Sequence, residues 1–372
     1  AATNSAAVRL SASINPSLGD EVLRISQWCR LTADELRLRT EFLLYLKTYL
    51  LDYNFPEEEG HVSPTICKDV LQFGSTLSGV DTFLSDIDIM ASLELENQSQ
   101  PSLPSTLTDG TTGSDADFIQ LCNKEDERRY VTDHADRDRN INKGPWLRTR
   151  SVQDTLVRSV LQLAKSLREL TNVSNCKAVA SASVPVIKAT DAATGFTVDI
   201  VLVNRARVSS LASGVTAVAE RIREAANDIA LFAPIVHVVQ LLLHQHKLDE
   251  LYSGGMNSFR VYVIVLSFLR TFSEVRADSN DATEALLNFL EFYGRAGILE
   301  RGSTVDSGLT DEPVSFQAVF RIKDIVHLFR TTHLILARGK RTNGSLLAPI
   351  LNVARFTVGT CRASEEVAKK LK

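Results

Sequence analysis

Long apolar runs are absent from this sequence of 372 residues. The longest uncharged one, residues 230–243, is interrupted by Pro234, His237 and Gln240, and it is shorter than the ~18 to 20 residues that a helix needs to cross a bilayer. We therefore expect no membrane-spanning helix. Cysteine is also scarce and shows no CxxC or Cys/His ligand spacing, which favours free thiols in a reducing compartment. The five are Cys29, Cys67, Cys122, Cys176 and Cys361.

An excess of charge of one sign is missing as well. The sequence has 41 Lys and Arg against 45 Asp and Glu, a formal net charge of −4, so any contact with nucleic acid must use a local basic patch. This weakens histone-like and coating roles. Apolar residues make up 44% and charged residues 23%, which is average for a globular protein and excludes disordered and fibrous classes. The length predicts about two or three domains.

The hydrophobic periodicity predicts an α+β protein. Thr32 and Glu35 have the spacing of a capping box at the start of a long amphipathic helix that ends near residues 54–56. Strands are expected from Asp69 to Gly79 and at 85–96, followed by a helix at 151–170 and two strands at 177–190 and 194–204. Helical periodicity dominates from Thr216 onward, at 228–247, 259–272, 282–293 and 322–338.

These elements suggest three regions with a cleft between the last two. The N-terminal segment is expected to pack on the helical domain, and the sheet domain is expected to carry an insertion that is poor in apolar residues, at about 97–149. The expected boundaries are 1–55 for the N-terminal segment, 56–205 for the sheet domain with its flanking helices, and 206–372 for the helical domain.

Two carboxylates and a Gly-Ser pair form the most informative pattern. On a strand, Asp86 and Asp88 point to one side while Ile87 points to the core. Two such charges ~4 Å apart repel by ~1 kcal/mol in water and ~4 kcal/mol at an effective dielectric of 20, so the pair requires a shared proton or a divalent cation. Mg²⁺ suits an all-oxygen site. Gly74 and Ser75 upstream can hold phosphate oxygens, although each motif alone is more often structural.

The order Gly74-Ser75, ten residues, then Asp86-x-Asp88 resembles the signature of the polymerase beta-like nucleotidyltransferases. The resemblance implies a third carboxylate on a later strand, which would be Asp199, after a segment at 184–188 that is similar to the family's "RVPIIK" strand and turn. In that family the three acids bind two Mg²⁺ (or Mn²⁺) ions. The implied reaction is attack of an RNA 3′-hydroxyl on the α-phosphorus of a nucleoside triphosphate, with release of pyrophosphate.

A second block, 232–259 with the helices that follow, is similar to the helical domain of non-standard poly(A) polymerases and terminal uridylyltransferases. The resemblance implies that Ser258 binds the triphosphate and that Phe259 stacks on the base, unless Phe259 merely starts a core helix. The chain departs from the family at Gln240, where a triphosphate lysine is common. The expected nucleotide-binding residues are Gly74, Ser75, Ser85, Ser209, Ser210, Ser258 and Phe259, with His244 or Lys247 as substitutes for the missing lysine.

The family's base-recognition loop is represented at best by 311–313, in shortened form. This departure, the short chain and the insertion after the Asp-x-Asp strand resemble the mitochondrial terminal uridylyltransferases of trypanosome RNA editing. The resemblance implies an enzyme that adds UMP from UTP to a single-stranded RNA 3′ end, in mitochondria and with an RNA-editing complex. The Ala/Ser-rich opening fits a trimmed transit segment or a frayed terminus, and nuclear or cytoplasmic locations stay open.

Three alternatives remain at this stage. A poly(A) polymerase that uses ATP is the direct rival, a catalytically silent relative that binds RNA or protein is the second, and a small-molecule nucleotidyltransferase is the third. The intact set of three acids disfavours a silent protein. RNA contact needs a basic surface. The candidates, which are more often ordinary solvated residues, are Arg148, Arg150, Arg158, Lys165, Arg338, Lys340 and Arg341.

Overall fold

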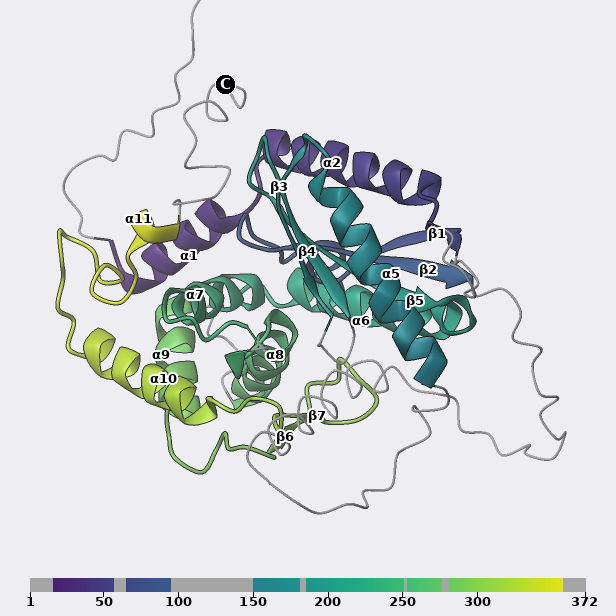
Figure 1. Cartoon of the computed structure of the whole chain (residues 1–372). Coiled ribbons are helices and arrows are strands. Elements are labelled where there is room, and N and C mark those ends of the chain that lie inside the picture. The colour runs from purple at the N-terminus through teal and green to yellow at the C-terminus, as the bar shows by residue number, and fades with distance from the viewer. Residues whose placement is uncertain are drawn as a thin grey trace, which may run out of the picture.

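The computed structural model describes residues 16–56, 65–94, 150–180, 185–250, 253–275 and 281–356. The chain forms a five-stranded mixed sheet with flanking helices and a mainly helical domain beside it (Figure 1). This confirms the α+β fold. The insertion expected at about 97–149 lies outside the described residues.

The sheet has the order β1-β2-β5-β4-β3. Its two central strands, β2 and β5, run parallel, and every other neighbouring pair is antiparallel. The expectation of one strand over 177–190 is wrong, because the segment is divided between the antiparallel strands β3 and β4. Pro185, which cannot donate a ladder hydrogen bond, lies just before β4. The strands are β1 (Thr65–Phe73), β2 (Ile87–Glu94), β3 (Val173–Val179), β4 (Val186–Asp191) and β5 (Thr197–Asn204).

Alternation along the strands gives the sheet two different faces. Ile87, Ile89, Val198 and Ile200 belong to one buried core, which also contains apolar residues of α2 (Ala33–Asp52) and α5 (Arg150–Arg168). The next residues along β2 and β5 face the other way, where Met90 forms a small separate cluster with Val201 and Val203. The acidic residues Asp88 and Asp199 therefore share this second face.

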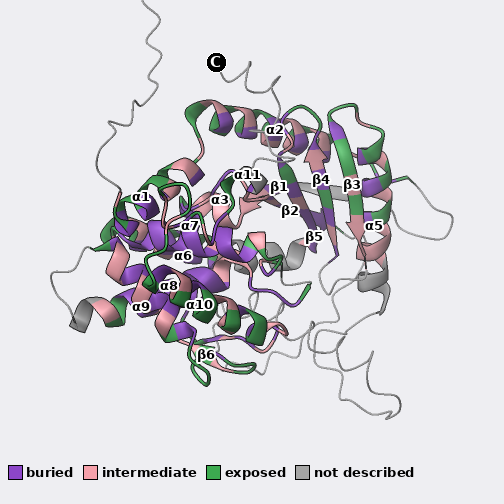
Figure 2. Ribbon diagram, turned by 90° about the vertical axis from the view of Figure 1, so that its left-hand side faces the viewer, coloured by how far each residue is buried: buried purple, intermediate pink, exposed green. Residues whose placement is uncertain are grey.

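The helical domain is built around one large apolar core. Buried residues fill α7 and α8 and continue into α9 and α10 (Figure 2). The helix expected from residue 228 begins only at Phe232, after a turn. The elements are α6 (Arg205–Asp228), α7 (Phe232–Gln245), α8 (Ser258–Val275), α9 (Ala282–Tyr293), α10 (Ile322–Ala337) and α11 (Val353–Phe356), with a two-stranded sheet of β6 (Thr304–Val305) and β7 (Val314–Ser315).

The two N-terminal helices divide between the two domains, whereas the sequence suggested that the whole segment packs on the helical domain. Leu18 and Val22 of α1 (Leu18–Cys29) are buried in the helical core. Phe42 and Leu46 of α2 are buried against the sheet. The expected capping box is present at the start of α2, where the backbone N–H of Glu35 donates to Thr32 Oγ1 and that of Thr32 donates to the Glu35 carboxylate.

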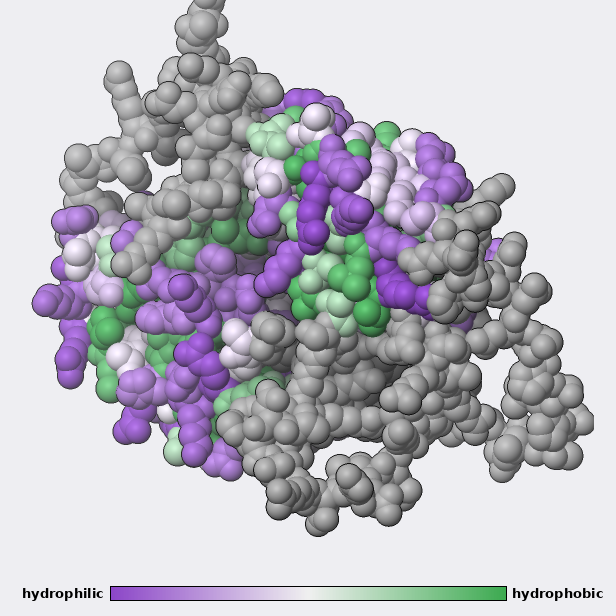
Figure 3. All heavy atoms as spheres, viewed as in Figure 1, coloured by the Kyte–Doolittle hydropathy of each residue, from purple (hydrophilic) through white to green (hydrophobic). Residues whose placement is uncertain are grey.

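Among the described helices, none taken singly has the length and apolarity needed to cross a membrane. One bent pair, Ser213–Asp228 with Phe232–Gln245, meets these criteria jointly, with an angle of 113° between its halves. In the second member the apolar residues are buried in the helical core. On the face drawn in Figure 3, the described surface is mainly hydrophilic, with smaller hydrophobic patches between.

Candidate active site

Three acidic residues meet at one edge of the central parallel strand pair. Asp88 of β2 and Asp199 of β5 are register partners across the pair, and Asp86 immediately precedes β2. The acids lie on one face of the sheet because side chains alternate along a strand. Ile87 and Val198 point to the core, so Asp88 and Asp199 next to them point to the opposite face. The structure thus brings together the three acids expected to be catalytic.

A lysine lies between two of these acids. Lys188 of β4 is the register partner of Asp199, and its Nζ is 2.7 Å from Asp199 Oδ2 and 3.9 Å from Asp86 Oδ2. Thr197 donates its hydroxyl hydrogen to Asp86 Oδ1. Lys188 is the last residue of the segment at 184–188, for which the sequence suggested no chemical role. Its signal was visible, because a lysine and an acid on adjacent strands of one sheet can face each other.

Burial and mutual repulsion make it difficult for all three acids to be charged. Burial, then the negative charges of Asp199 and Asp86, raise the pKa of Asp88 well above its usual value. Burial and the charge of Asp86 raise the pKa of Asp199 to about 6, although Lys188 acts in the opposite direction. The pKa of Lys188 is lowered by burial but is raised overall, because the two carboxylates outweigh that effect. Positive charge next to the cluster is therefore favoured.

Gly74 allows the chain to pass close to Asp88. It follows β1 with φ of 78°, in the region that favours glycine, and precedes the short helix α3 (Ser75–Ser78). A Cβ atom at this position would collide with the Asp88 carboxylate. The Gly-Ser pair is therefore next to the acids, as the sequence predicts, and its Ser75 begins α3.

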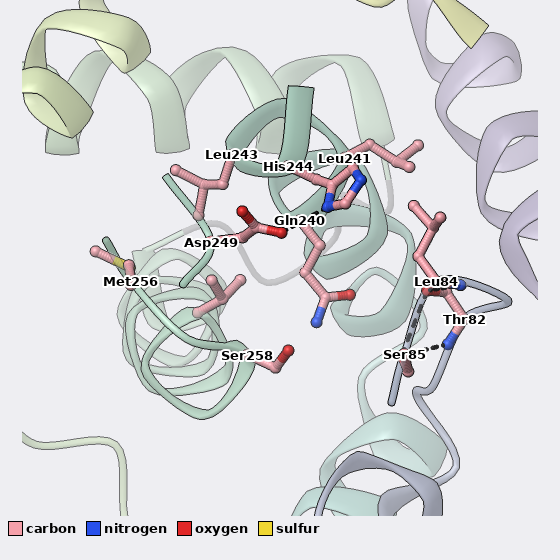
Figure 4. Close-up of a pocket in the computed structure, with 11 residues that line it drawn as sticks. Thr82, Leu84, Ser85, Gln240, Leu241, Leu243, His244, Asp249, Met256 and Ser258 are labelled. Atoms are coloured by element: carbon pink, nitrogen blue, oxygen red, sulfur yellow. Dashed lines mark hydrogen bonds and ion pairs between the residues drawn. The ribbon is translucent and has the colours of Figure 1, made fainter. Parts of the chain in front are cut away.

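An open pocket lies between the loop that precedes β2 and the helical domain. The loop before β2 supplies Thr82 and Ser85, while α7 supplies Gln240 and His244 from the opposite wall and Ser258 closes one side (Figure 4). Ser85 directly precedes Asp86, so the pocket opens next to the acidic cluster.

His244 is held by an acidic neighbour. Its Nδ1 is 2.6 Å from Asp249 Oδ2, and the two side chains point toward each other across the pocket wall in Figure 4. The hydrogen bond to Asp249 raises the pKa of His244, an effect that burial only partly reverses. Asp249 is a pocket residue that the sequence analysis missed, and its place five residues after His244, beyond the helix end, gave no periodic signal.

Other expected nucleotide-binding residues are placed differently. Lys247 lies past the end of α7 in a left-handed turn with φ of 54°, so it does not continue the face of Gln240 and His244. Phe259 is partly buried against the helical core, which is the structural alternative named for it. Ser209 and Ser210 lie in the first turns of α6, where side chains are outside the described part.

The segment at 311–313, which the sequence suggested as a shortened base-recognition loop, contacts α6. Arg221 donates from Nη1 to the Leu309 carbonyl at 3.0 Å and lies 3.3 Å from Asp311 Oδ1. Arg341, one of the candidate RNA-binding residues, is engaged by Pro16 and Gly344 carbonyls at 2.8 Å each. These arginines contribute to the fold.

The donor set suits a hard divalent cation. Three carboxylates against one ammonium leave an excess of negative charge, and all-oxygen ligands are what Mg²⁺ and Mn²⁺ prefer. Within the described ranges, however, no three His, Cys, Asp or Glu side chains converge closely enough to enclose an ion. Lys188 and Thr197 instead hold Asp86 and Asp199. The residues therefore fit a divalent cation by the chemistry of their donor atoms, and Asp86, Asp88 and Asp199 are the side chains that would hold it.

Comparison with known proteins agrees with this arrangement. The family model of the central palm domain of poly(A) RNA polymerases of the mitochondrial-like type matches residues 18–210, more than half of the chain. The chain belongs to this family. The match begins at α1 and includes the three acids, Gly74 and Lys188, and so covers the whole acidic cluster.

Curated relatives carry similar names. Poly(A) RNA polymerase protein 2 of Saccharomyces cerevisiae is 26% identical over 141 residues, which are 37% of this chain and 23% of the relative. Poly(A) RNA polymerase CID14 of Cryptococcus neoformans is 29% identical over 143 residues, 37% of this chain and 18% of the relative. The inactive Trf4-2 protein of Drosophila melanogaster is 31% identical over 118 residues, 31% and 27% of the two chains. The matches span about a quarter or less of these relatives.

Solved structures share the fold over nearly the entire chain. The polymerase core of TRAMP, an RNA surveillance complex, has a TM-score of 0.52 at 16% identity and covers 94% of this chain and 93% of its own. The mtPAP complex with CTP has a TM-score of 0.55 at 12% identity and covers 91% and 72%. At this identity the likeness establishes the poly(A)-polymerase-type fold alone.

Proposed function

We propose that the chain is an RNA 3′-terminal nucleotidyltransferase that adds AMP from ATP to a single-stranded RNA 3′ end and releases pyrophosphate. The observation that carries the proposal is the placement of Asp86, Asp88 and Asp199 on one face of β2 and β5, beside a pocket closed by the helical domain. The family supports a nucleotidyltransferase of the poly(A) polymerase type. Divalent metal ions bound by these acids would stabilise the attacking and leaving oxygens.

The residues of the chain have separable tasks in this reaction. Asp199 would bind the ion that activates the RNA 3′-oxygen and would receive the proton of the 3′-hydroxyl. The backbone at Gly74 passes close to Asp88, and the Gly74-Ser75 turn would hold phosphate oxygens there. Ser85, Gln240, His244 and Ser258 line the pocket that would receive the nucleotide. The hydrogen bond to Asp249 raises the pKa of His244, so His244 would supply positive charge for the triphosphate when it is protonated.

ATP replaces UTP as the proposed substrate. The sequence favoured UTP on resemblance to trypanosome editing enzymes, whereas the relatives named above are poly(A) polymerases and the family is of the mitochondrial poly(A) polymerase type. One solved neighbour was also crystallised with UTP, GTP and CTP, so the fold accepts other nucleotides. The mitochondrial location and the editing complex stay predictions.

Extension of a labelled single-stranded RNA oligonucleotide tests the proposal. Purified protein with Mg²⁺ and each of the four ribonucleoside triphosphates separately should extend the RNA best with ATP. Asp199→Asn should abolish extension because it removes a charged ligand and proton acceptor without changing the volume. Asp228→Asn, an exposed change at the end of α6, should behave as the wild type.

Each outcome decides a different part of the proposal. Extension with UTP in strong preference to ATP would restore the uridylyltransferase assignment. Full activity of Asp199→Asn would contradict the role of this acid. No extension with any nucleotide, by a protein that is folded and supplied with Mg²⁺ or Mn²⁺, would contradict the proposed function and favour a silent relative, a type already present among the similar proteins as Trf4-2.

A further inference from the structure

An arginine of the second N-terminal helix is bound to the loop that carries the first two acids. Arg39 of α2 is 4% exposed, and its Nη1 is 3.1 Å from Asp81 Oδ2. The same nitrogen donates to the Thr82 carbonyl at 3.5 Å, and Nη2 donates to the Ser85 carbonyl. One side chain thereby holds three oxygens of the Asp81–Ser85 loop. The Asp81 carboxylate and the Thr82 carbonyl lie at its start, and the Ser85 carbonyl lies at its end.

This loop is also anchored in the helical domain. Phe83 is buried in the helical core and packs edge-to-face against Trp28 of α1, with ring centroids 4.8 Å apart. The Phe83 N–H donates to the Cys29 carbonyl at 3.1 Å, and the Thr82 N–H donates to Ser85 Oγ at 2.9 Å. The middle of the loop, at Phe83, therefore contacts α1 and the helical domain. Both ends of the loop contact Arg39, which belongs to the sheet domain.

The loop ends at the site itself. Ser85, whose carbonyl accepts from Arg39, lines the pocket, and the next residue is Asp86. Two residues further, Asp88 enters register with Asp199. A change in the Ser85 peptide plane would move Asp86 and the start of β2 relative to β5, because few backbone torsions separate them.

We propose that Arg39 is a positioning residue, which holds the Asp81–Ser85 loop so that Asp86 and Asp88 face Asp199 in the geometry required to bind divalent cations. This inference rests on the proposed function and names a residue outside the acids and the pocket. The planar guanidinium donates in two directions at once, which a lysine ammonium on a flexible stem cannot reproduce while keeping Asp81 paired.

Binding of Mn²⁺ alone, measured by the loss of the free-ion electron paramagnetic resonance signal, gives a readout that does not require activity. Arg39→Lys should weaken Mn²⁺ binding by about 10- to 100-fold, the usual effect of losing a group that orients metal ligands. Arg37→Lys is the matched control, because Arg37 lies on the same helix, is 53% exposed and pairs only locally with Asp34 and Glu41. It should leave Mn²⁺ binding unchanged.

RNA extension supplies the second readout. Arg39→Lys should lower kcat and raise the Mg²⁺ concentration for half-maximal rate by a similar factor, with KM for the nucleotide changed less than about threefold. If Arg39→Lys lowers only the yield of folded protein, and the folded fraction binds Mn²⁺ and extends RNA as the wild type does, the role of Arg39 is merely structural and the proposal is overturned. Wild-type protein that never extends RNA would contradict the proposed function, while the Mn²⁺ comparison would still decide the role of Arg39.

A double variant separates charge neutralisation from positioning. Arg39→Met with Asp81→Asn removes both members of the buried ion pair, so no unpaired charge is left to unfold the protein. The carbonyls of Thr82 and Ser85 then lack their donor, and Mn²⁺ binding should stay as weak as in Arg39→Lys. Recovery of wild-type Mn²⁺ binding in the double variant would show that Arg39 only neutralises Asp81, and would refute the proposal.

Discussion

At the scale of single residues, the acidic cluster depends on a glycine as much as on the acids. Gly74 has no Cβ, and the space that a Cβ would occupy is filled by the Asp88 carboxylate. The chain can therefore bring the N–H groups that follow β1 against an acid on β2. A larger residue at this position must displace either the Asp88 side chain or the turn.

Gly74→Ala should reduce RNA extension by about 100-fold, because a shift of about 1 Å at reacting groups is enough for a loss of that size. Gly79→Ala is the control: Gly79 also has a positive φ, 72°, but a Cβ there meets nothing within 4 Å. It should cost about 1 to 2 kcal/mol of stability and leave kcat unchanged. Steady-state extension rates and urea denaturation measure the two effects. Equal loss of activity in both variants would contradict the collision argument.

Residue-scale patterns in the sequence located the acids and the Gly-Ser turn because both lie within one strand-turn-strand segment. The same patterns missed the effect of Arg39, although its position was informative. Arg39 shares the buried face of α2 with Glu35, Phe42, Leu46 and Leu50. A charged residue in register with core positions must have a buried partner, but the identity of that partner depends on contacts between residues far apart in the chain.

At the scale of elements, a buried glutamate joins α1 to the C-terminal end of the described chain. Glu21 is 6% exposed and accepts from the N–H groups of Leu346 and Leu347 at 2.9 Å each and from Ser345 Oγ at 2.6 Å. Arg341 lies 3.6 Å away. One carboxylate thus satisfies the turn that follows α10 and fixes it to the N-terminal helix.

Glu21→Ala should lower the free energy of unfolding by about 2 to 4 kcal/mol, because it leaves buried N–H donors without their charged acceptor. Glu220→Ala removes an exposed glutamate whose 3.9 Å contact to Arg223 is of the weak surface type, and should change stability by less than about 0.5 kcal/mol. Urea denaturation of both variants checks the difference. If the urea midpoint of Glu21→Ala equals that of the wild type, the N–H groups of Leu346 and Leu347 do not depend on Glu21 for a hydrogen-bond acceptor, which would contradict the prediction.

The contact between α1 and α7 includes a buried histidine. His237 is 1% exposed and its Nδ1 lies 2.9 Å from Ser26 Oγ. Burial lowers the pKa of His237 to about 4, and the nearby positive charge of Arg30 acts in the same direction, although hydrogen bonds to Val80 and Ser26 oppose it. The native state therefore keeps this imidazole neutral at neutral pH.

Stability should fall as the pH decreases from about 6.5 to about 4, because the unfolded chain binds a proton at His237 that the folded chain refuses. The full effect amounts to about 3 kcal/mol, and it is absent above pH 6.5. His237→Asn retains a polar group at the place of Nδ1 and removes the titration. Denaturation at pH 7 and pH 5 should show a smaller pH dependence for the variant, and an identical dependence in both proteins would contradict the buried neutral histidine.

Element types were largely predictable, and element boundaries and partners less so. Periodicity identified α2, α5, α8, α9 and α10, because each has a clear apolar face. It merged β3 and β4, because small and apolar residues continue without a charged residue from Ala178 to Ile187 and leave no mark of the boundary in the sequence. It also extended α7 backward across the turn at 229–231, where the residues are apolar but not helical.

At the scale of the whole molecule, the site exists only where the two domains meet. The acids lie on the sheet, whereas Gln240, His244 and Ser258 belong to the helical domain, and the pocket between them is lined from both sides. The α1–α2 pair crosses between the same domains and reaches the loop before Asp86. Sequence spacing could predict the acids of the sheet domain and the pocket residues of the helical domain separately. It could not predict how close the two sets lie in the folded chain.

Nucleotide affinity should therefore depend on the pocket wall opposite the acids. His244→Ala should raise KM for ATP by about tenfold, because it removes a cation from the triphosphate region, with a smaller change in kcat. His246→Ala changes an exposed histidine just past the end of α7 and should leave KM unchanged. Initial rates at several ATP concentrations measure this. An unchanged KM in His244→Ala would place the triphosphate elsewhere.

The central claim is that Asp86, Asp88 and Asp199 jointly hold divalent cations against a nucleoside triphosphate. Crystals soaked with Mn²⁺ and a non-hydrolysable ATP analogue test it most directly, because anomalous scattering locates the ions without reference to activity. The account predicts ion peaks within coordination distance of carboxylate oxygens from all three residues, with the triphosphate in the pocket lined by Ser85 and Ser258. Ordered nucleotide whose Mn²⁺ lies away from Asp199 would contradict it.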